Sequence, residues 1–113
     1  MKTHSQNFLF EKDLQWENPG PGITRQIMGY DGQIMMVKVV FEEGAIGAPH
    51  KHFHSQVTYV ASGEFEFTVG NETHLVKAGD SLYKEPNIPH GCICKKAGML
   101  IDVFSPSRQD FLK

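Results

Sequence analysis

Short apolar and β-branched segments, each followed by turn-forming residues, occupy most of this chain. Glycine, proline, asparagine or aspartate interrupts the apolar pattern about every eight to twelve residues, and no segment reads as a helix of about ten residues or more. This pattern is typical of an antiparallel sandwich or barrel. We therefore expect an all-β protein with roughly eight strands, at residues 23–30, 34–41, 57–61, 64–69, 73–77, 81–84, 91–95 and 99–104.

The residues between these segments indicate how the strands connect. Residues 64–69 alternate strictly between polar and apolar side chains, which marks a strand with one side facing water. The dipeptides Gly70-Asn71 and Asp31-Gly32 are signals for two-residue hairpin turns.

Other glycines and prolines are expected to interrupt the sheet. We expect Ser62-Gly63 to end the strand at residues 57–61. Residues 17–22 contain two Pro-Gly pairs and read as a break between segments.

The length of 113 residues, the hydrophobic content of 40% and the net charge of −2 fit a single globular domain. The chain has no basic run and no apolar run long enough to span a bilayer, so we expect neither nucleic acid nor a membrane as a partner. Within this domain, residues 1–113, we expect an N-terminal arm at residues 1–16, a barrel core at 34–104 and a C-terminal tail at 105–113. A helical turn is expected at residues 108–113.

The only two cysteines, Cys92 and Cys94, lie too close in sequence for an unstrained disulfide. A reducing compartment is the simplest interpretation, and we expect a cytoplasmic protein. The two thiols are candidates for metal ligands, but their place in an apolar segment favours small buried strand residues.

Three of the six histidines recur at every second position and are followed at the same spacing by an amide. In an extended strand, side chains two residues apart point the same way, so His50, His52, His54 and Gln56 would share one face. Neutral imidazoles that converge suit zinc, iron, nickel, copper or manganese. The alternative is a solvated loop, which the intervening lysine and serine would fit.

A further histidine, His90, follows a turn that Pro86 and Pro89 stiffen. Metal sites commonly draw ligands from separate strands, and a rigid turn fixes where the last ligand points. His90 is therefore a candidate ligand, whereas His74 reads as a surface strand residue.

An aspartate interrupts the last apolar segment. Alternation places Leu100, Asp102 and Phe104 on one face of that strand, and a carboxylate inside such a strand is costly unless it is paired or used. One interpretation is a structural ion pair with Arg108 or Lys38. The other is a general acid or base whose pKa is tuned by apolar walls and a cation.

These motifs resemble those of the cupins, the small double-stranded β-helix or jelly-roll barrels. The first cupin motif is carried by Gly44, His50, His52, Gln56 and Gly63, with glutamine where most cupins have glutamate. The second is carried by Gly79 and His90, with Glu85 in the proline position and Cys94 in the asparagine position.

A narrower resemblance, to the pectin-degradation cupins of the KdgF type, runs nearly end to end. It is carried by three segments, which read His-x-His-x-His-x-Gln-x-Thr-Tyr-Val from His50, Asn-Ile-Pro-His-Gly-Cys from Asn87 and Asp-Val-Phe-Ser-Pro-Ser-Arg-Gln-Asp-Phe-Leu from Asp102. The glutamine at Gln56 belongs to this subfamily's pattern. The resemblance implies a metal-binding enzyme that converts 4,5-unsaturated uronate monosaccharides, from pectin or alginate breakdown, to linear keto sugars.

The same resemblance implies which residues form the metal centre. A divalent transition metal (nickel, zinc, iron or manganese) would be held by His50, His52, Gln56 and His90, with His54 turned aside to the rim of the site. Three neutral imidazoles and an amide leave the ion its full charge, which makes it a strong Lewis acid towards substrate oxygens.

Roles for the substrate contacts also follow from the resemblance. Asp102 would move a proton, and Arg108 would bind the uronate carboxylate with its planar fork and assist catalysis. Phe104 and Tyr59 would pack against the sugar. The structural alternatives are a solvated charge for Arg108 and core packing for Phe104 and Tyr59.

Two other functions remain open, a metal-dependent cupin dioxygenase and a non-catalytic sugar-binding module. The expected partner is a small sugar acid. The N-terminal arm and the apolar outer face formed by Met99, Ile101 and Val103 also predict a homodimer.

Overall fold

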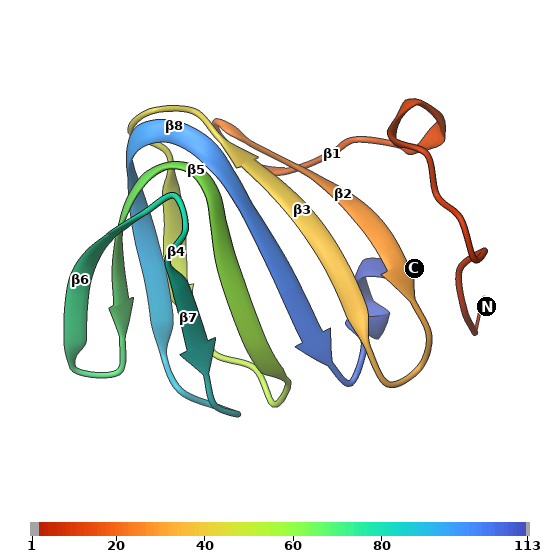
Figure 1. The fold of residues 1–113 in the computed structure, drawn as a ribbon. Coiled ribbons are helices and arrows are strands. Elements are labelled where there is room, and N and C mark those ends of the chain that lie inside the picture. The colour runs from red at the N-terminus through yellow and green to blue at the C-terminus, as the bar shows by residue number, and fades with distance from the viewer. Residues whose placement is uncertain (1–2, 113) are drawn as a thin grey trace.

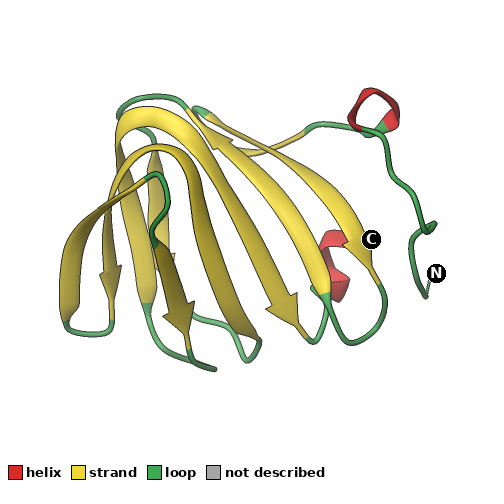
Figure 2. Ribbon diagram, viewed as in Figure 1, coloured by secondary structure: helices red, strands yellow, loops and turns green. Residues whose placement is uncertain are grey.

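The computed structural model describes residues 3–112, which fold into eight strands and two short 3₁₀ turns (Figures 1 and 2). The strands pair antiparallel in the order β1-β2-β3-β8-β5-β6, with β4 on β8 and β7 on β5, and the sheet curls over on itself. This confirms the all-β architecture. The strands are β1 Glu17–Gly20, β2 Ile23–Tyr30, β3 Met35–Phe41, β4 Ile46–His50, β5 Ser55–Val69, β6 Glu72–Lys77, β7 Ser81–Lys84 and β8 His90–Ser105.

The two longest strands, β5 and β8, run side by side and bend together (Figure 1). The sequence analysis divided each of them in two, and this was wrong: Ser62 and Gly63 bend β5 without ending it. Gly63 has a φ of +81°, and a Cβ built there would lie 2.6 Å from the carbonyl oxygen of Lys96. A Cβ on Gly98 would lie 2.1 Å from the carbonyl oxygen of Ser62. Glycine is needed at both positions because the two backbones approach so closely at the bend.

Two other local predictions also needed correction. The predicted break at residues 17–22 contains strand β1. The Asp31-Gly32 turn is four residues long, because the Asp31 carboxylate accepts hydrogen bonds from the backbone N–H groups of Gln33 and Ile34. By contrast, the two-residue turn at Gly70-Asn71 joins β5 to β6 as predicted.

The core lies between the two halves of the curled sheet. Phe41 and Phe65 meet edge to face with ring centroids 5.2 Å apart, and Val60 and Leu100 pack in the same cluster. Burying a side chain of this size stabilises the fold by about 1.5–3 kcal/mol. Buried residues occupy alternate positions along each half of β5, and the phase shifts at the bend between Val60 and Phe65, so each half on its own gives the apolar alternation of a strand.

Residues 3–16 lie along β2 and β3 of the same chain. The backbone N–H of Ser5 donates to the carbonyl of Tyr30, and Glu11 forms an ion pair with Lys38. Lys38 is thus buried on the outer face of β3, beneath this arm. At the other end, the turn Gln109–Leu112 confirms the helical turn predicted for residues 108–113, the last of which is outside the described range. No helix within residues 3–112 is long and apolar enough to cross a membrane.

Candidate metal and substrate site

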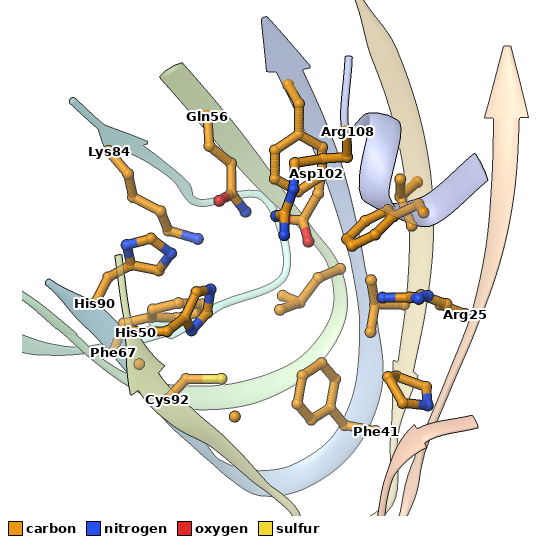
Figure 3. A pocket seen from close by; sticks show the side chains of 18 residues that line it. Arg25, Phe41, His50, Gln56, Phe67, Lys84, His90, Cys92, Asp102 and Arg108 are labelled. Carbon is orange, nitrogen blue, oxygen red and sulfur yellow. The ribbon is translucent and has the colours of Figure 1, made fainter. Parts of the chain in front are cut away.

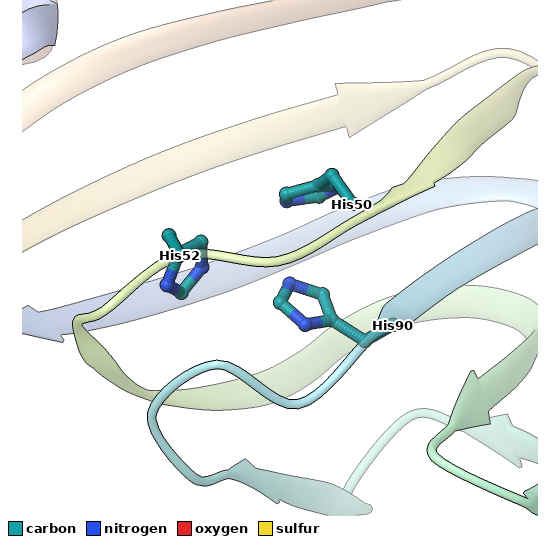
Figure 4. A group of neighbouring side chains, drawn as sticks. All are labelled: His50, His52 and His90. Atoms are coloured by element: carbon teal, nitrogen blue, oxygen red, sulfur yellow. The ribbon is translucent and has the colours of Figure 1, made fainter.

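Three histidine rings converge where β4 ends and β8 begins (Figure 4). His50 ends β4, His52 lies in the following loop and His90 starts β8, and their ligand atoms all lie within 4.8 Å of one another. Metal–nitrogen bonds of about 2.1 Å would separate two nitrogens on one ion by at most about 4.2 Å. Small ring rotations would therefore close this group on a single cation.

The turn before β8 brings His90 to this place, as its prolines predicted. Asn87 adopts a φ of +66°, and its backbone N–H donates to the carbonyl of His52 at 2.7 Å. The loop that carries one histidine is thus hydrogen-bonded to the loop that carries another.

The hydrogen bonds of the three rings leave the Nε2 atoms available as ligands. The Nδ1 atoms of His50 and His90 donate to the carbonyls of Ala48 and Ile88, each at 2.9 Å. The Nδ1 of His52 donates to the carbonyl of the residue two positions on, at 3.1 Å. The Nε2 of His90 is buried and has no hydrogen-bond partner among the described residues. A buried nitrogen lone pair without a donor is what a metal ion would satisfy.

Gln56 completes this arrangement. Its Oε1 lies 2.9 Å from the Nε2 of His52, although that nitrogen has no proton when Nδ1 donates to the backbone. Two electron-pair donors facing each other repel, and a cation between them removes the repulsion. The residues present therefore fit a metal ion.

Burial keeps two of these imidazoles neutral. Desolvation lowers the pKa of His90 to about 4, against the opposing effect of its hydrogen bond to Ile88. Desolvation also lowers the pKa of His52, with Arg108 and His50 adding to the shift. Neutral imidazoles at pH 7 have the lone pairs that metal binding requires.

His54 lies outside this group. The four aligned positions predicted from the sequence do not form one extended face, because β4 ends at His50 and β5 starts only at Ser55. The His54 ring stacks on Phe53 at 4.0 Å and is 6.3 Å from Phe104. It is buried and is not a member of the histidine group.

A pocket of about 230 Å³ opens beside the histidines (Figure 3). Leu100, Asp102 and Phe104 all line it, so the face predicted from alternation is confirmed. Its ionisable lining consists of one carboxylate, Asp102, the two imidazoles of His50 and His90, the Cys92 thiol and three cationic side chains. The three cations are Arg25, Lys84 and Arg108.

Asp102 forms neither of the ion pairs considered as its structural explanation. Lys38 pairs with Glu11, and Arg108 pairs with Asp110. Instead, Oδ1 of Asp102 accepts a 2.6 Å hydrogen bond from the hydroxyl of Thr58.

The guanidinium of Arg108 lies above the ring of Phe104, 5.1 Å from its centroid. Its Nε and Nη2 donate to the two carboxylate oxygens of Asp110 at 3.1 and 3.0 Å. These hydrogen bonds lower the pKa of Asp110. The ring of Phe111 lies between two guanidinium groups, with Arg108 at 4.2 Å and Arg25 at 3.9 Å from its centroid.

Two sequence predictions about side chains can be compared directly with the structure. Tyr59, expected to contact substrate, is 50% exposed and does not line the pocket, because it alternates with the buried Thr58 and Val60. This expectation is therefore corrected. Cys92 and Cys94 are free, buried strand residues, as favoured, and neither belongs to the histidine group.

Sequence analysis missed Lys84 and Thr58. Thr58 is buried and donates a hydrogen bond to Asp102, and Lys84 lines the pocket. Alternation could have identified Thr58, which shares the face of Gln56. Alternation could also have identified Lys84, because it lies two positions after the apolar Leu82 and therefore on the same, inward face of β7.

Comparisons with known proteins agree with this geometry. Residues 37–104 match the model of the cupin domain. The chain is 43% identical over 107 residues to the pectin degradation protein KdgF of Dickeya dadantii (strain 3937), covering 93% of this chain and 97% of that protein.

Two solved structures are similar over almost their whole length. An RmlC-like cupin from Shewanella frigidimarina NCIMB 400 has a TM-score of 0.94 and 42% identity, covering 97% of this chain and 99% of that one. KdgF from Halomonas sp. has a TM-score of 0.89 and 33% identity, covering 95% and 99%.

Proposed function

Since this chain belongs to the cupin family and, within it, to the family of pectin degradation protein KdgF, we propose that it ketonises unsaturated uronates. Its substrates are 4,5-unsaturated uronate monosaccharides from pectin or alginate breakdown, and its products are linear 4-deoxy-5-keto uronates. The observation that carries this proposal is a single pocket that joins a histidine cluster, one carboxylate and three cations.

The pocket suits a small anion. Its volume of about 230 Å³ is below the range of about 300–1,000 Å³ usual for drug-sized ligands, so it fits one sugar unit better than a polysaccharide. Arg108 binds the uronate carboxylate in place of Asp110, whose own carboxylate already shows that the fork accepts such a group. Phe104, below that guanidinium, packs against the sugar face.

The residues that would hold the metal are His50, His52, Gln56 and His90. A divalent transition metal bound there, whether nickel, zinc, iron or manganese, would supply a Lewis acid for the substrate's hydroxyl oxygens. His54 packs within the loop between β4 and β5 that carries His52 and is not one of the ligands.

Ketonisation requires one hydration and one ring opening. The double bond between C4 and C5 is lost as C4 gains a proton and C5 gains the hydroxyl of water. The bond from C5 to the ring oxygen then breaks and the proton of the C5 hydroxyl moves to that oxygen, which leaves a ketone at C5 and two hydroxyls on C1. Loss of one of these hydroxyls as water gives the C1 aldehyde, so the added water is returned and the linear product is an isomer of the substrate. No electrons are exchanged with a cofactor. Asp102 moves the proton, either to C4 or from the water, and general acid–base catalysis contributes about 10²–10⁴-fold.

A homodimer remains part of this proposal. The outer face of β5, β7, β8 and β3 carries exposed or half-exposed apolar side chains, which a second copy could cover. They are Met36, Val57, Tyr59, Tyr83, Met99, Ile101 and Val103. The cytoplasmic location and the absence of a nucleic-acid partner stay predictions.

The test uses purified chain, its metal content from elemental analysis, and an unsaturated galacturonate monosaccharide. We expect the ultraviolet absorbance of the double bond to disappear faster than in a sample without protein, with a keto acid as product. Oxygen uptake with a phenolic or thiol substrate would instead indicate a dioxygenase. Tight sugar binding with no loss of absorbance would indicate a binding module.

A further inference from the structure

Lys84 lines the pocket, yet only 2% of the residue is exposed. Desolvation lowers its pKa, and the nearby Asp102 carboxylate acts in the opposite direction. Its Nζ donates to the hydroxyl of Thr58 at 2.8 Å and lies 4.6 Å from the centre of the Phe67 ring. A buried ammonium group is strongly unfavourable without such partners, and an apolar side chain of similar volume would often be as stable. The presence of a lysine at position 84 therefore needs an explanation other than the stability of the fold.

The Thr58 hydroxyl joins Lys84 to the acid. A hydroxyl has one proton to donate and two lone pairs that accept. One lone pair of Thr58 accepts from Lys84, which can only donate. The proton of Thr58 is donated to Oδ1 of Asp102 at 2.6 Å.

The second lone pair of Thr58 connects this chain to the histidine cluster. It accepts from the Nε2 of Gln56 at 3.3 Å. Because the hydroxyl proton is already donated to the carboxylate, the amide must present its N–H group to Thr58. The amide oxygen, Oε1, is thereby turned towards His52. One hydroxyl thus sets the orientation of two side chains of the site.

We propose that Lys84 and Thr58 are positioning residues for the ketonisation, an inference that rests on the proposed function. Thr58 occupies Oδ1 of Asp102, so proton exchange with the substrate takes place through Oδ2. Lys84 holds the Thr58 hydroxyl in place, and its charge acts on the nearby Asp102 carboxylate. Neither residue exchanges a proton with the substrate itself.

The first test replaces Thr58 with valine, which keeps the shape and removes the hydroxyl. With saturating metal, we expect Thr58→Val to lower kcat about 10- to 100-fold while KM changes less than about threefold. Thr58→Ser restores the hydroxyl and should return kcat to within a few fold of the parent value. The matched control is Thr68→Val on the same strand, whose hydroxyl pairs with Thr73 on the surface and which should keep the parent rate.

The second test combines Thr58→Val with Lys84→Met. Since both act through one hydroxyl, the double variant should lose about as much kcat as the more damaging single variant. Losses that multiply would overturn the inference, as would parent-level kcat in Thr58→Val or no recovery in Thr58→Ser. A Lys84→Met chain that does not fold leaves the valine and serine pair decisive. A parent chain that leaves the double bond intact would instead overturn the proposed function and, with it, the catalytic part of this inference.

Discussion

His50 and His90 face each other across β4 and β8, with ring centroids 4.4 Å apart, although they come from different halves of the sequence. Each donates from Nδ1 to the carbonyl two residues before it, at the same distance of 2.9 Å. The repeated local contact uses Nδ1 of both rings and leaves both Nε2 atoms available as ligands. The pair therefore defines the centre of the candidate metal site.

Removing one of these rings should empty the site. We expect the purified parent chain to contain about one transition-metal ion, and His90→Ala to lower metal affinity by more than about 10-fold. Chelator treatment of the parent should abolish activity, and added divalent metal should restore it. His74→Ala is the matched control, because that ring pairs with Glu72 on the surface. Equal metal content in the two variants would contradict the assignment.

Asp102→Asn keeps the size of the side chain and removes the carboxylate. We expect kcat on unsaturated galacturonate to fall about 10²–10⁴-fold, with metal content unchanged by elemental analysis. Asp80→Asn should behave like the parent, since that carboxylate lies outside the pocket and accepts a turn hydrogen bond from the backbone N–H of Lys77. Ketonisation at the parent rate by Asp102→Asn would exclude the proposed proton transfer.

Arg108→Lys retains the charge but loses the planar fork. A lysine cannot bind a carboxylate through two parallel hydrogen bonds, so we expect KM for the uronate to rise about 10-fold or more. Asp110→Asn removes the carboxylate that Arg108 now holds, and KM should not rise in that variant. The measurement is initial rate against substrate concentration. An unchanged KM in Arg108→Lys would rule out the carboxylate contact.

The two thiols should be slow to react in the folded chain. Burial raises the pKa of Cys92 from 9.0 to about 11, which reduces its thiolate fraction at pH 8 by about 100-fold. Burial also raises the pKa of Cys94. Alkylation by iodoacetamide, followed by mass spectrometry, should be far slower at pH 8 than in the urea-unfolded chain, and faster as the pH approaches 11. Rapid labelling of the folded chain at pH 8 would contradict this burial.

Much of the fold follows from local pattern, because alternation and turn residues act within a few positions. Alternation correctly placed Leu100 and Phe104 on one face of β8, and the turn residues Gly70 and Asn71 correctly marked the hairpin between β5 and β6. The prediction that Gly63 ends a strand was wrong, since a glycine that ends a strand and one that lets two strands approach closely look the same in sequence. Only the facing Gly98 distinguishes them, and their contact is a tertiary one.

Some residues of the candidate site could likewise be predicted from local sequence, whereas others depend on contacts between strands. Spacing and resemblance singled out the histidines and Asp102, and the structure brings His50, His52 and His90 together and places Asp102 in the adjoining pocket. The interaction of Lys84 with Thr58 could not be predicted, because β7 had first to pair with β5. Tyr59 was misassigned because proximity to a motif in sequence says nothing about which face of a strand a side chain occupies.

The histidine that begins β8 and the carboxylate near its end are joined by a single continuous strand that bends at Gly98. The separation between His90 and Asp102 is consequently a property of the backbone curvature of β8. Efforts to adapt this barrel to larger or smaller sugars should therefore replace pocket-lining residues such as Arg25 or Phe111. The glycines at the bend of β5 and β8, Gly63 and Gly98, should be kept.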